Sequence, residues 1–524
     1  MLHSTNYRAS SPIFRWMLLC ALSWCGLASA SDPFSTENDH QANPVLHANG
    51  HGNHAAPDKV ARHARFLPLD RPSQVGGGAN ESLREFDVQL PCPDSLPEHA
   101  LNLPEVVNFA LCNNPQTREV WANSRAQAAQ VGVVQAGYLP NLGVNLSESQ
   151  STPGNRQRSA GLSLSYLLYD FGARAAHLES ARHTLLALNA TEDGTVQSLF
   201  LAAVQAYYQI QATRAALDAA DVSEQAAQQS FKVADARYRA GSATPADKLS
   251  AQTAWSQTTL NRITAQGALK IAQGNLANLL GLDANTSVRL VAPLASLIPP
   301  PRQGEVWDGE GVKLPDELAV LKDFEQNVAA LIEQARQSRP DLQAAQATLK
   351  AAQANADAAR AAGKPTLALT AAANQNNSEG INTNSSTLGL NLSVPLFSGY
   401  APTYRIRAAL ALVETRKAQL ERIRLQVALD VWTAWQNLTT ATETLRTTAD
   451  LLGSAAQSER VARGRYQAGA GIMLDVLNAQ TTLAAARQQR IQAELNWNVS
   501  RAALAQAMGH LDAGMLRTDN NEPR

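Results

Sequence analysis

The chain has 524 residues, and its 44 lysines and arginines almost balance its 45 aspartates and glutamates. This balance argues against a nonspecific nucleic-acid binder, which needs a basic surface. Aromatic residues make up only 5% of the chain and charged residues 17%, while alanine and glutamine dominate long stretches. Such a composition is typical of extended helices and coiled coils rather than of a conventional globular enzyme.

The N-terminus carries the features of an export signal. Arg8 and Arg15 precede an apolar run over 16–27, which ends in a small-residue triplet at 28–30. We predict a signal peptide over 1–30 that is removed on export. No later stretch has the roughly 18 uninterrupted apolar residues of a transmembrane helix, so we expect any membrane contact to use β-strands.

The segment that follows, 31–91, is rich in Pro, Gly, Asn and His, and we predict a disordered extension. Its five histidines have no carboxylate or cysteine partner at a spacing that would fix a metal, so we expect no metal site. Export allows Cys92 and Cys112 to oxidise, and a disulfide across this spacing would stabilise the fold by about 3 kcal/mol. The alternative is two unpaired thiols.

The remainder is a tandem duplication. Pro115 and Pro140 recur as Pro340 and Pro365, and further along the offset settles at 228 residues. Pairs at that offset include Arg237/Arg465, Tyr238/Tyr466, Gly241/Gly469, Asp247/Asp475 and Gly281/Gly509. A register held over this length predicts two copies of one fold. The predicted boundaries are 92–290 for the first repeat, 291–328 for a Pro- and Gly-rich linker, 329–510 for the second repeat and 511–524 for a tail.

Each copy opens with a helical segment, 104–137 in the first, and continues with two segments that alternate apolar and polar residues. Period-two alternation predicts a β-hairpin with one apolar face. The predicted strands are about 141–150, 159–169, 366–375 and 387–397. Each has about ten residues, the length that a tilted strand needs to cross a bilayer.

Strands with one polar face also occur in ordinary half-solvated sheets. A membrane sheet is favoured because the predicted apolar faces carry no charge, aromatics cluster near the strand ends and the protein is exported. These aromatics are Tyr138, Tyr166, Tyr169, Phe171, Phe397 and Tyr400. Four strands cannot close a barrel, and open edges cannot stand in lipid, so several chains must share one barrel.

A long helical run follows each hairpin, about 173–240 and about 401–468. A helix of this length spans on the order of 100 Å. Small and apolar residues recur with three-four spacing, which predicts coiled-coil packing. They are Val196, Leu199, Ala203, Ala206, Ile210, Thr213 and Leu217 in the first run, and Val427, Val431, Ala434, Leu438, Ala441 and Leu445 in the second.

Each long helix ends in a matching turn. The two turns are 237–247 and 465–475. We expect Gly241 and Gly469 to end the helices in the left-handed conformation, and Asp247 and Asp475 to stabilise the start of the return helices. The functional alternative is that a ring of symmetry-related carboxylates, together with Arg/Tyr hydrogen bonds, closes or lines a pore mouth at these turns.

Three features recur in both copies. They are the Arg-Tyr-x-x-Gly-x5-Asp-x-Leu motif at the turns, the hairpin ends at 169–172 and 394–399, and Pro115 and Pro340. Together they resemble the TolC family of outer-membrane factors over about 101–510. The resemblance implies a mainly α homotrimer with a membrane β-barrel, in which four strands per protomer form a shared 12-stranded barrel continued by a long coiled-coil α-helical barrel. The segment 110–117 is similar to the subgroup that exports the adenylate cyclase toxin.

The resemblance also implies roles for individual residues. The periplasmic gate would use Asp247, Tyr466 and Asp475, and the adaptor would dock on Gly241, Ser242, Gly469 and Ala470. Gly471 and Asn478 replace the family's turn arginine and its second aspartate ring. Any selectivity ring therefore depends on Asp475 alone.

We find no nucleotide, zinc-protease or hydrolase motif, and expect neither enzymatic activity nor a cofactor. The expected function is a passive outer-membrane channel that extends into the periplasm, for type I protein secretion, small-molecule efflux or both. Its expected partners are its own copies, a periplasmic adaptor, an inner-membrane ABC transporter or proton-driven pump, and outer-membrane lipid, but no nucleic acid. The alternative is a periplasmic coiled-coil adaptor or structural protein, although an adaptor typically has one helical hairpin and this chain has two.

Overall fold

The computed structural model describes residues 96–97, 99–151, 155–291, 328–378 and 381–511, which all belong to one compact unit, Gly78–Arg524. The predicted signal peptide, the His-rich extension, most of the linker and the tail beyond Leu511 lie outside the described residues. The predictions for those segments therefore remain predictions.

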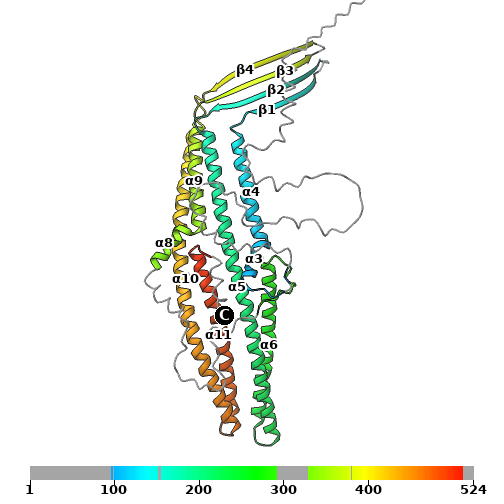
Figure 1. Cartoon of the computed structure of the whole chain (residues 1–524), viewed down its shortest axis with the longest axis vertical. Helices are drawn as coiled ribbons and strands as arrows, with labels where there is room; N and C mark the ends of the chain where they lie inside the picture. The colour runs from blue at the N-terminus through cyan, green and yellow to red at the C-terminus, as the bar shows by residue number, and fades with distance from the viewer. Residues whose placement is uncertain (1–95, 98, 152–154, 292–327, 379–380, 512–524) are drawn as a thin grey trace, which may run out of the picture. The chain divides into compact units, whose positions relative to one another are not determined.

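The two halves of the chain contain the same elements in the same order (Figure 1). The first half has α3 (Leu103–Asn113), α4 (Pro115–Ala136), β1 (Asn141–Ser151), β2 (Asn155–Tyr169), α5 (Ala173–Arg239) and α6 (Pro245–Leu279). The second has α8 (Val328–Ser338), α9 (Pro340–Ala361), β3 (Thr366–Ser378), β4 (Ile381–Ser393), α10 (Ala401–Gln467) and α11 (Met473–Ala507). Corresponding helices have equal lengths of 11, 22, 67 and 35 residues. The duplication in the sequence is thus a duplication of structure.

The opening helical segment is divided into two helices, α3 and α4, where the sequence predicted one over 104–137. Asn114 has an extended backbone, and its side chain accepts a hydrogen bond from the backbone N–H of Gln116 at 2.8 Å. Its amide also donates to the carbonyl of Leu279 at 2.9 Å, which ties the break to the end of α6. Pro115 then starts α4. Because proline has no backbone N–H, no donor is left unpaired at this first position of the helix. The same break recurs between α8 and α9, before Pro340.

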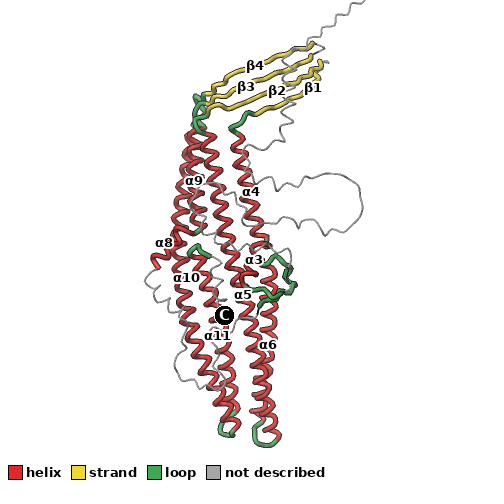
Figure 2. Tube along the Cα trace, in the orientation of Figure 1, coloured by secondary structure: helices red, strands yellow, loops and turns green. Residues whose placement is uncertain are grey.

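The long helices lie side by side (Figure 2), and small and apolar residues are buried between them. Helix α5 packs on α4, α6, α9 and α11, and α10 packs on α8, α9 and α11. The predicted three-four stripe is buried at Leu199, Ala203 and Ile210 in α5 and over its whole length, from Val427 to Leu445, in α10. Small side chains let the helix axes approach closely, as in coiled coils.

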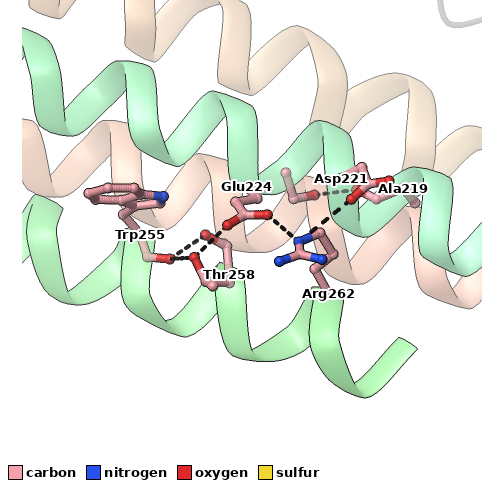
Figure 3. A network of polar contacts seen from close by, with 8 residues as sticks. Ala219, Asp221, Glu224, Trp255, Thr258 and Arg262 are labelled. Carbon is pink, nitrogen blue, oxygen red and sulfur yellow. Dashed lines mark hydrogen bonds and ion pairs between the residues drawn. The ribbon is translucent and has the colours of Figure 1, made fainter. Parts of the chain in front are cut away.

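A polar network links α5 to its return helix α6 (Figure 3). Arg262 Nε lies 2.6 Å from Glu224 Oε2 and 3.8 Å from an oxygen of Asp221. The hydroxyl of Thr259 donates to the other oxygen of Glu224 at 2.6 Å. Because each partner reaches across from the opposite helix, this network specifies the register of the two helices in addition to their apolar packing.

The four strands form one antiparallel sheet in the order β1-β2-β3-β4. Strand β2 begins at Asn155, four residues before the predicted start, and β3 extends to Ser378. Strand β4 runs from Ile381 to Ser393, so it begins earlier and ends earlier than predicted. Its end falls just before Pro395, which has no backbone N–H for a ladder hydrogen bond.

All four strands join helices at the same end of the sheet. Strands β1 and β3 start there and β2 and β4 end there, because the neighbours are antiparallel. Aromatic pairs mark this boundary: Tyr169 and Phe171 have ring centroids 4.8 Å apart, and Phe397 and Tyr400 5.7 Å apart. Tyr138 lies in the connection between α4 and β1, so five of the six predicted girdle aromatics are at the junction between strands and helices.

Candidate functional site

The sheet separates apolar and polar residues onto opposite faces. The strand register places Leu142, Leu164, Ala371 and Leu388 side by side in one row across all four strands. Residues two positions away along each strand continue the same apolar face. They include Val144, Leu146, Leu162, Tyr166, Leu367, Leu369, Leu390 and Leu392. The opposite face carries mainly Gly, Ser, Thr and Asn, with Leu167, Ala368 and Ala372 among them, so the predicted amphipathic hairpins combine into one amphipathic sheet.

This apolar face is uncovered within the single chain. Val144, Leu146 and Leu388 each keep more than 70% of their surface exposed, at 72%, 74% and 77%. A contiguous apolar patch of this kind marks an interaction with a membrane or a partner. Strands β1 and β4 form the two edges of the sheet, and their backbone groups need partners before such a sheet can lie in lipid.

The sheet also contains charge that the sequence pattern missed. Because β2 starts at Asn155, Arg156 and Arg158 lie within it, and Arg158 pairs directly with Glu148 of β1. These residues share the parity of Leu146 and therefore lie on the apolar face, at the end away from the helices. The expectation that this face carries no charge was wrong for two reasons: Glu148 already lay within the predicted strand 141–150 with the parity of Leu146, and β2 starts early enough to include both arginines.

The turn between α5 and α6 is held by local hydrogen bonds. Gly241 has φ 72°, and the N–H of Ser242 donates to the carbonyl of Arg237 at 2.9 Å. Thr244 and Asp247 then form a capping box, in which the backbone N–H of Asp247 donates to the Thr244 hydroxyl and a carboxylate oxygen of Asp247 accepts from the Thr244 N–H, both at 3.2 Å. The carboxylate of Asp247 is thus engaged at the helix start.

The turn between α10 and α11 differs at the matching aspartate. Gly469 has φ 77°, and the N–H of Ala470 donates to the carbonyl of Arg465 at 2.9 Å. The residue before α11 is Ile472, which makes no side-chain cap, and Asp475 is exposed in the first turn. Asp475 therefore keeps a solvated carboxylate where Asp247 is held by Thr244.

Tyr466 connects the two turns. Only 8% of its surface is exposed, and it packs with Ala234, Ala251, Met473 and Val476. The guanidinium of Arg237 lies over its ring, with the central carbon 4.3 Å from the ring centroid, and donates to the carbonyl of Gln467 at 3.1 Å. Among the described residues, the Tyr466 hydroxyl has no hydrogen-bond partner. Within the protomer, Tyr466 therefore makes its contacts through its ring and not through its hydroxyl.

For Arg237, sequence reasoning considered only Arg/Tyr hydrogen bonds at the pore mouth and did not predict its contact with the ring of Tyr466. The signal was present, because Arg-Tyr recurs at both turns as Arg237-Tyr238 and Arg465-Tyr466. The sequence could not show that the arginine of one turn stacks on the tyrosine of the other. That contact arises only when α5 and α10 lie against the same cluster of side chains.

The four residues expected to receive an adaptor all lie on the surface. Gly241, Ser242, Gly469 and Ala470 are exposed, and a Cβ added at either glycine would meet no atom within 4 Å. The two turns thus present small residues with open space around them. A helix of another protein can approach such a surface closely.

The remaining predicted sites are settled only in part by the described residues. Cys112 is disulfide-bonded, whereas Cys92 lies outside the described residues. Among the described residues, no group of three or more His, Cys, Asp and Glu side chains is placed to hold a metal ion. None of the described helices combines the length and apolarity that a membrane-spanning helix requires.

A known protein family matches both copies of the duplication. The family model described as outer membrane efflux protein matches residues 106–282 and 331–510. Protein CyaE of Bordetella pertussis is 31% identical, over 83% of this chain and 90% of its own length. Proteases secretion protein PrtF of Dickeya chrysanthemi is 24% identical over 76% and 86%, and outer membrane protein TolC of Escherichia coli is 22% identical over 80% and 85%.

Solved structures show the same fold at lower sequence identity. A crystal structure of CusC superposes with a TM-score of 0.65 at 23% identity, covering 78% of this chain and 92% of that chain. The outer membrane protein VceC of Vibrio cholerae superposes with a TM-score of 0.65 at 19% identity, covering 78% and 96%.

The chain belongs to the outer membrane efflux protein family, the TolC family of outer-membrane channels. It is an outer-membrane channel protein of the export systems of Gram-negative bacteria, and a transport protein rather than an enzyme. Membership implies a trimeric channel that works with export machinery. This decides between the two classes that the sequence left open, in favour of the channel and against the periplasmic adaptor.

Proposed function

We propose that this chain is the outer-membrane duct of a tripartite type I secretion machine, with a protein as its cargo. The main support is the 31% identity to Protein CyaE over 83% of the chain. It agrees with the resemblance of segment 110–117 to a toxin-exporting subgroup. A second relative, proteases secretion protein PrtF, is by its name also a protein-secretion component. The runner-up cargo is small molecules, because the family model describes efflux proteins.

The proposed barrel follows from the edges and faces of the sheet. Three copies would pair β4 of one protomer with β1 of the next, which closes a barrel of twelve strands and removes both open edges. The apolar face would then contact lipid and the Gly, Ser and Asn face would line the interior, as in outer-membrane barrels. The helices would continue the duct into the periplasm, over on the order of 100 Å.

The proposed gate lies at the two helical turns. Asp475 would place one solvated carboxylate per protomer at the pore mouth, and Tyr466 would hold the two turns of its own protomer together through Arg237. Asp247 would act mainly as a helix cap. Cys92 and Cys112 are proposed as the disulfide pair.

The proposed partners are a periplasmic adaptor and an inner-membrane ABC transporter, with a proton-driven pump as the alternative energy source. The channel contains no nucleotide-binding motif of its own, so the energy must come from the inner membrane. The adaptor would dock on Gly241, Ser242, Gly469 and Ala470, where small exposed residues permit close helix approach.

The docking surface and the cargo can be tested together with the variants Ser242→Trp and Ala470→Trp. These positions avoid Gly241 and Gly469, whose positive φ would strain any side chain. In the producing cell, we expect each variant to lose chemical cross-linking to the adaptor and to lower protein secretion about tenfold or more, with trimer amount unchanged. Antibiotic susceptibility should not change.

Two results would contradict this proposal. Normal cross-linking of both variants would remove the docking surface from these residues. A rise in antibiotic susceptibility with normal protein secretion would assign the duct to small-molecule efflux. Leu260→Trp, an exposed position of α6 outside the turns, is the matched control for added bulk.

A further inference from the structure

All charged residues in the described strands belong to one cluster. Glu148 of β1 and Arg156 and Arg158 of β2 are the charged side chains within the strand residues that the structure describes, and β3 and β4 contribute none. Arg158 Nε lies 3.2 Å from Glu148 Oε1, and Arg156 pairs with the same oxygen. One carboxylate thus holds two guanidinium groups, which leaves one net positive charge.

The register fixes where this cluster lies. Leu146 pairs with Ala160, Glu148 with Arg158 and Gln150 with Arg156, in consecutive rows on the apolar face. Successive rows on one face are two residues apart, so Arg158 lies about 7 Å beyond Leu146 and Ala160, the last apolar pair of β1 and β2. The arginines follow the apolar band directly, at the end of the sheet away from all four helix junctions.

If the proposed barrel holds, this position is the outer headgroup level of the membrane. The apolar band on β2, from Tyr169 to Ala160, is about 30 Å long along the strand, which fits the apolar belt of an outer-membrane barrel once the strands are tilted. The helices mark the periplasmic end, so the arginines lie at the outer leaflet. They are directed to the lipid side because they share the face of the leucines.

We propose that Arg156 and Arg158 form a site for the phosphate group of a phosphorylated outer-leaflet lipid of the lipid A type. Guanidinium groups bind phosphate through paired charge-assisted hydrogen bonds, and arginine is suited to a partly desolvated interface. The side chains of both arginines are 59% exposed, so their remaining donors are accessible. Glu148 neutralises only one of the two guanidinium charges, which leaves the positive charge that an anionic headgroup needs. The inference rests on the proposed barrel.

The test is native mass spectrometry of the detergent-purified full chain, titrated with bisphosphorylated lipid A, with dephosphorylated lipid A and with inorganic phosphate. The variants are the double change Arg156→Gln and Arg158→Gln, the single change Glu148→Gln, and the control Arg360→Gln. Arg360 is a similarly exposed arginine, paired with Asp357 at 2.6 Å on a helix. Trimer mass and single-channel conductance are measured on every sample.

We expect the trimer to retain lipid A, the double variant to bind it at least about tenfold more weakly, and Arg360→Gln to bind it normally. Glu148→Gln should bind it as tightly as the unaltered chain or more tightly, because the competing carboxylate is removed. Equal lipid A binding by the double variant and the unaltered trimer would overturn the site. Equal retention of dephosphorylated lipid A, or full displacement by inorganic phosphate, would overturn the lipid phosphate as its ligand. An unaltered chain that forms no conducting trimer would overturn the barrel itself, and this inference with it.

Discussion

Asp247 and Asp475 occupy matching positions of the duplication and yet differ in their contacts. Asp247 shares a capping box with Thr244, whereas Ile472 leaves Asp475 without such a partner. Sequence reasoning predicted helix-start roles for both and kept a gate role as the alternative. It did not separate them, although the signal is present in the sequence: the residue three positions earlier is a threonine in one turn and an isoleucine in the other, and only the threonine can form a capping box.

This difference predicts separable effects of two substitutions. Asp475→Ala should reduce the cation-to-anion permeability ratio about twofold without changing stability, because a ring of carboxylates attracts cations at a pore mouth. Asp247→Ala should lower stability by about 1 kcal/mol through loss of the cap and leave permeability nearly unchanged. Reversal potentials in planar bilayers and thermal unfolding measure the two effects. Equal changes in permeability would show that both aspartates line the pore.

The contact between Arg237 and Tyr466 predicts that substitutions at these two residues affect gating differently. Arg237→Gln removes a cation–π contact of about 0.5–2 kcal/mol, which should raise the open-to-closed ratio roughly two- to thirty-fold. Tyr466→Phe keeps the ring and removes a hydroxyl that has no partner among the described residues, so its gating should match the unaltered channel. Single-channel recordings give the ratio. If Tyr466→Phe opened the channel as much as Arg237→Gln, the hydroxyl rather than the ring would be closing it.

At the scale of elements, periodicity predicted most of the fold for physical reasons. The period-two segments place their leucines on one face because neighbouring strands pair in register, and the three-four stripe of α10 is buried as predicted. Ends of elements were less predictable. The break at Asn114 depends on a hydrogen bond to Leu279, which is distant in the sequence, and β2 includes Arg156 and Arg158 because pairing with β1 continues past the apolar residues.

The polar network between α5 and α6 predicts a pH-dependent stability. The hydrogen bond from Thr259 and then the interaction with Arg262 lower the pKa of Glu224 below its ordinary value of 4.5. The folded state therefore binds a proton less readily than the unfolded state, so the stabilisation is complete above about pH 4.5 and is lost as pH falls through the folded pKa. Glu224→Gln should lower the melting temperature at pH 7 and converge with the unaltered chain in acid.

Thr259→Val provides the matched test of the cause. It removes the largest contribution to the lowered pKa of Glu224 and leaves Arg262 in place. In the Thr259→Val background, the destabilisation by Glu224→Gln should therefore be smaller and should be lost completely at a higher pH. Thermal unfolding between about pH 3 and about pH 7, a range that includes the ordinary glutamate pKa of 4.5, measures this series. A constant difference between Glu224→Gln and the unaltered chain across that range would show that the network does not titrate.

At the scale of the whole molecule, the single chain is incomplete by its own physical chemistry. It presents one sheet with two open edges and an uncovered apolar face, and neither is stable in water or in lipid without further copies. The sequence predicted the need for several chains from strand number, but the trimer came from family resemblance. Strand pattern alone does not count protomers, because edge pairing is a property of the assembly.

The shared barrel is tested most directly by the oligomer mass and the single-channel conductance of one detergent-purified sample in a planar bilayer. We expect a trimer that inserts and conducts, because only strands shared between chains can satisfy both edges of the sheet. A monomer or dimer that stays soluble and carries no current would contradict it, since the exposed leucines of β1 and β4 would then need a different partner.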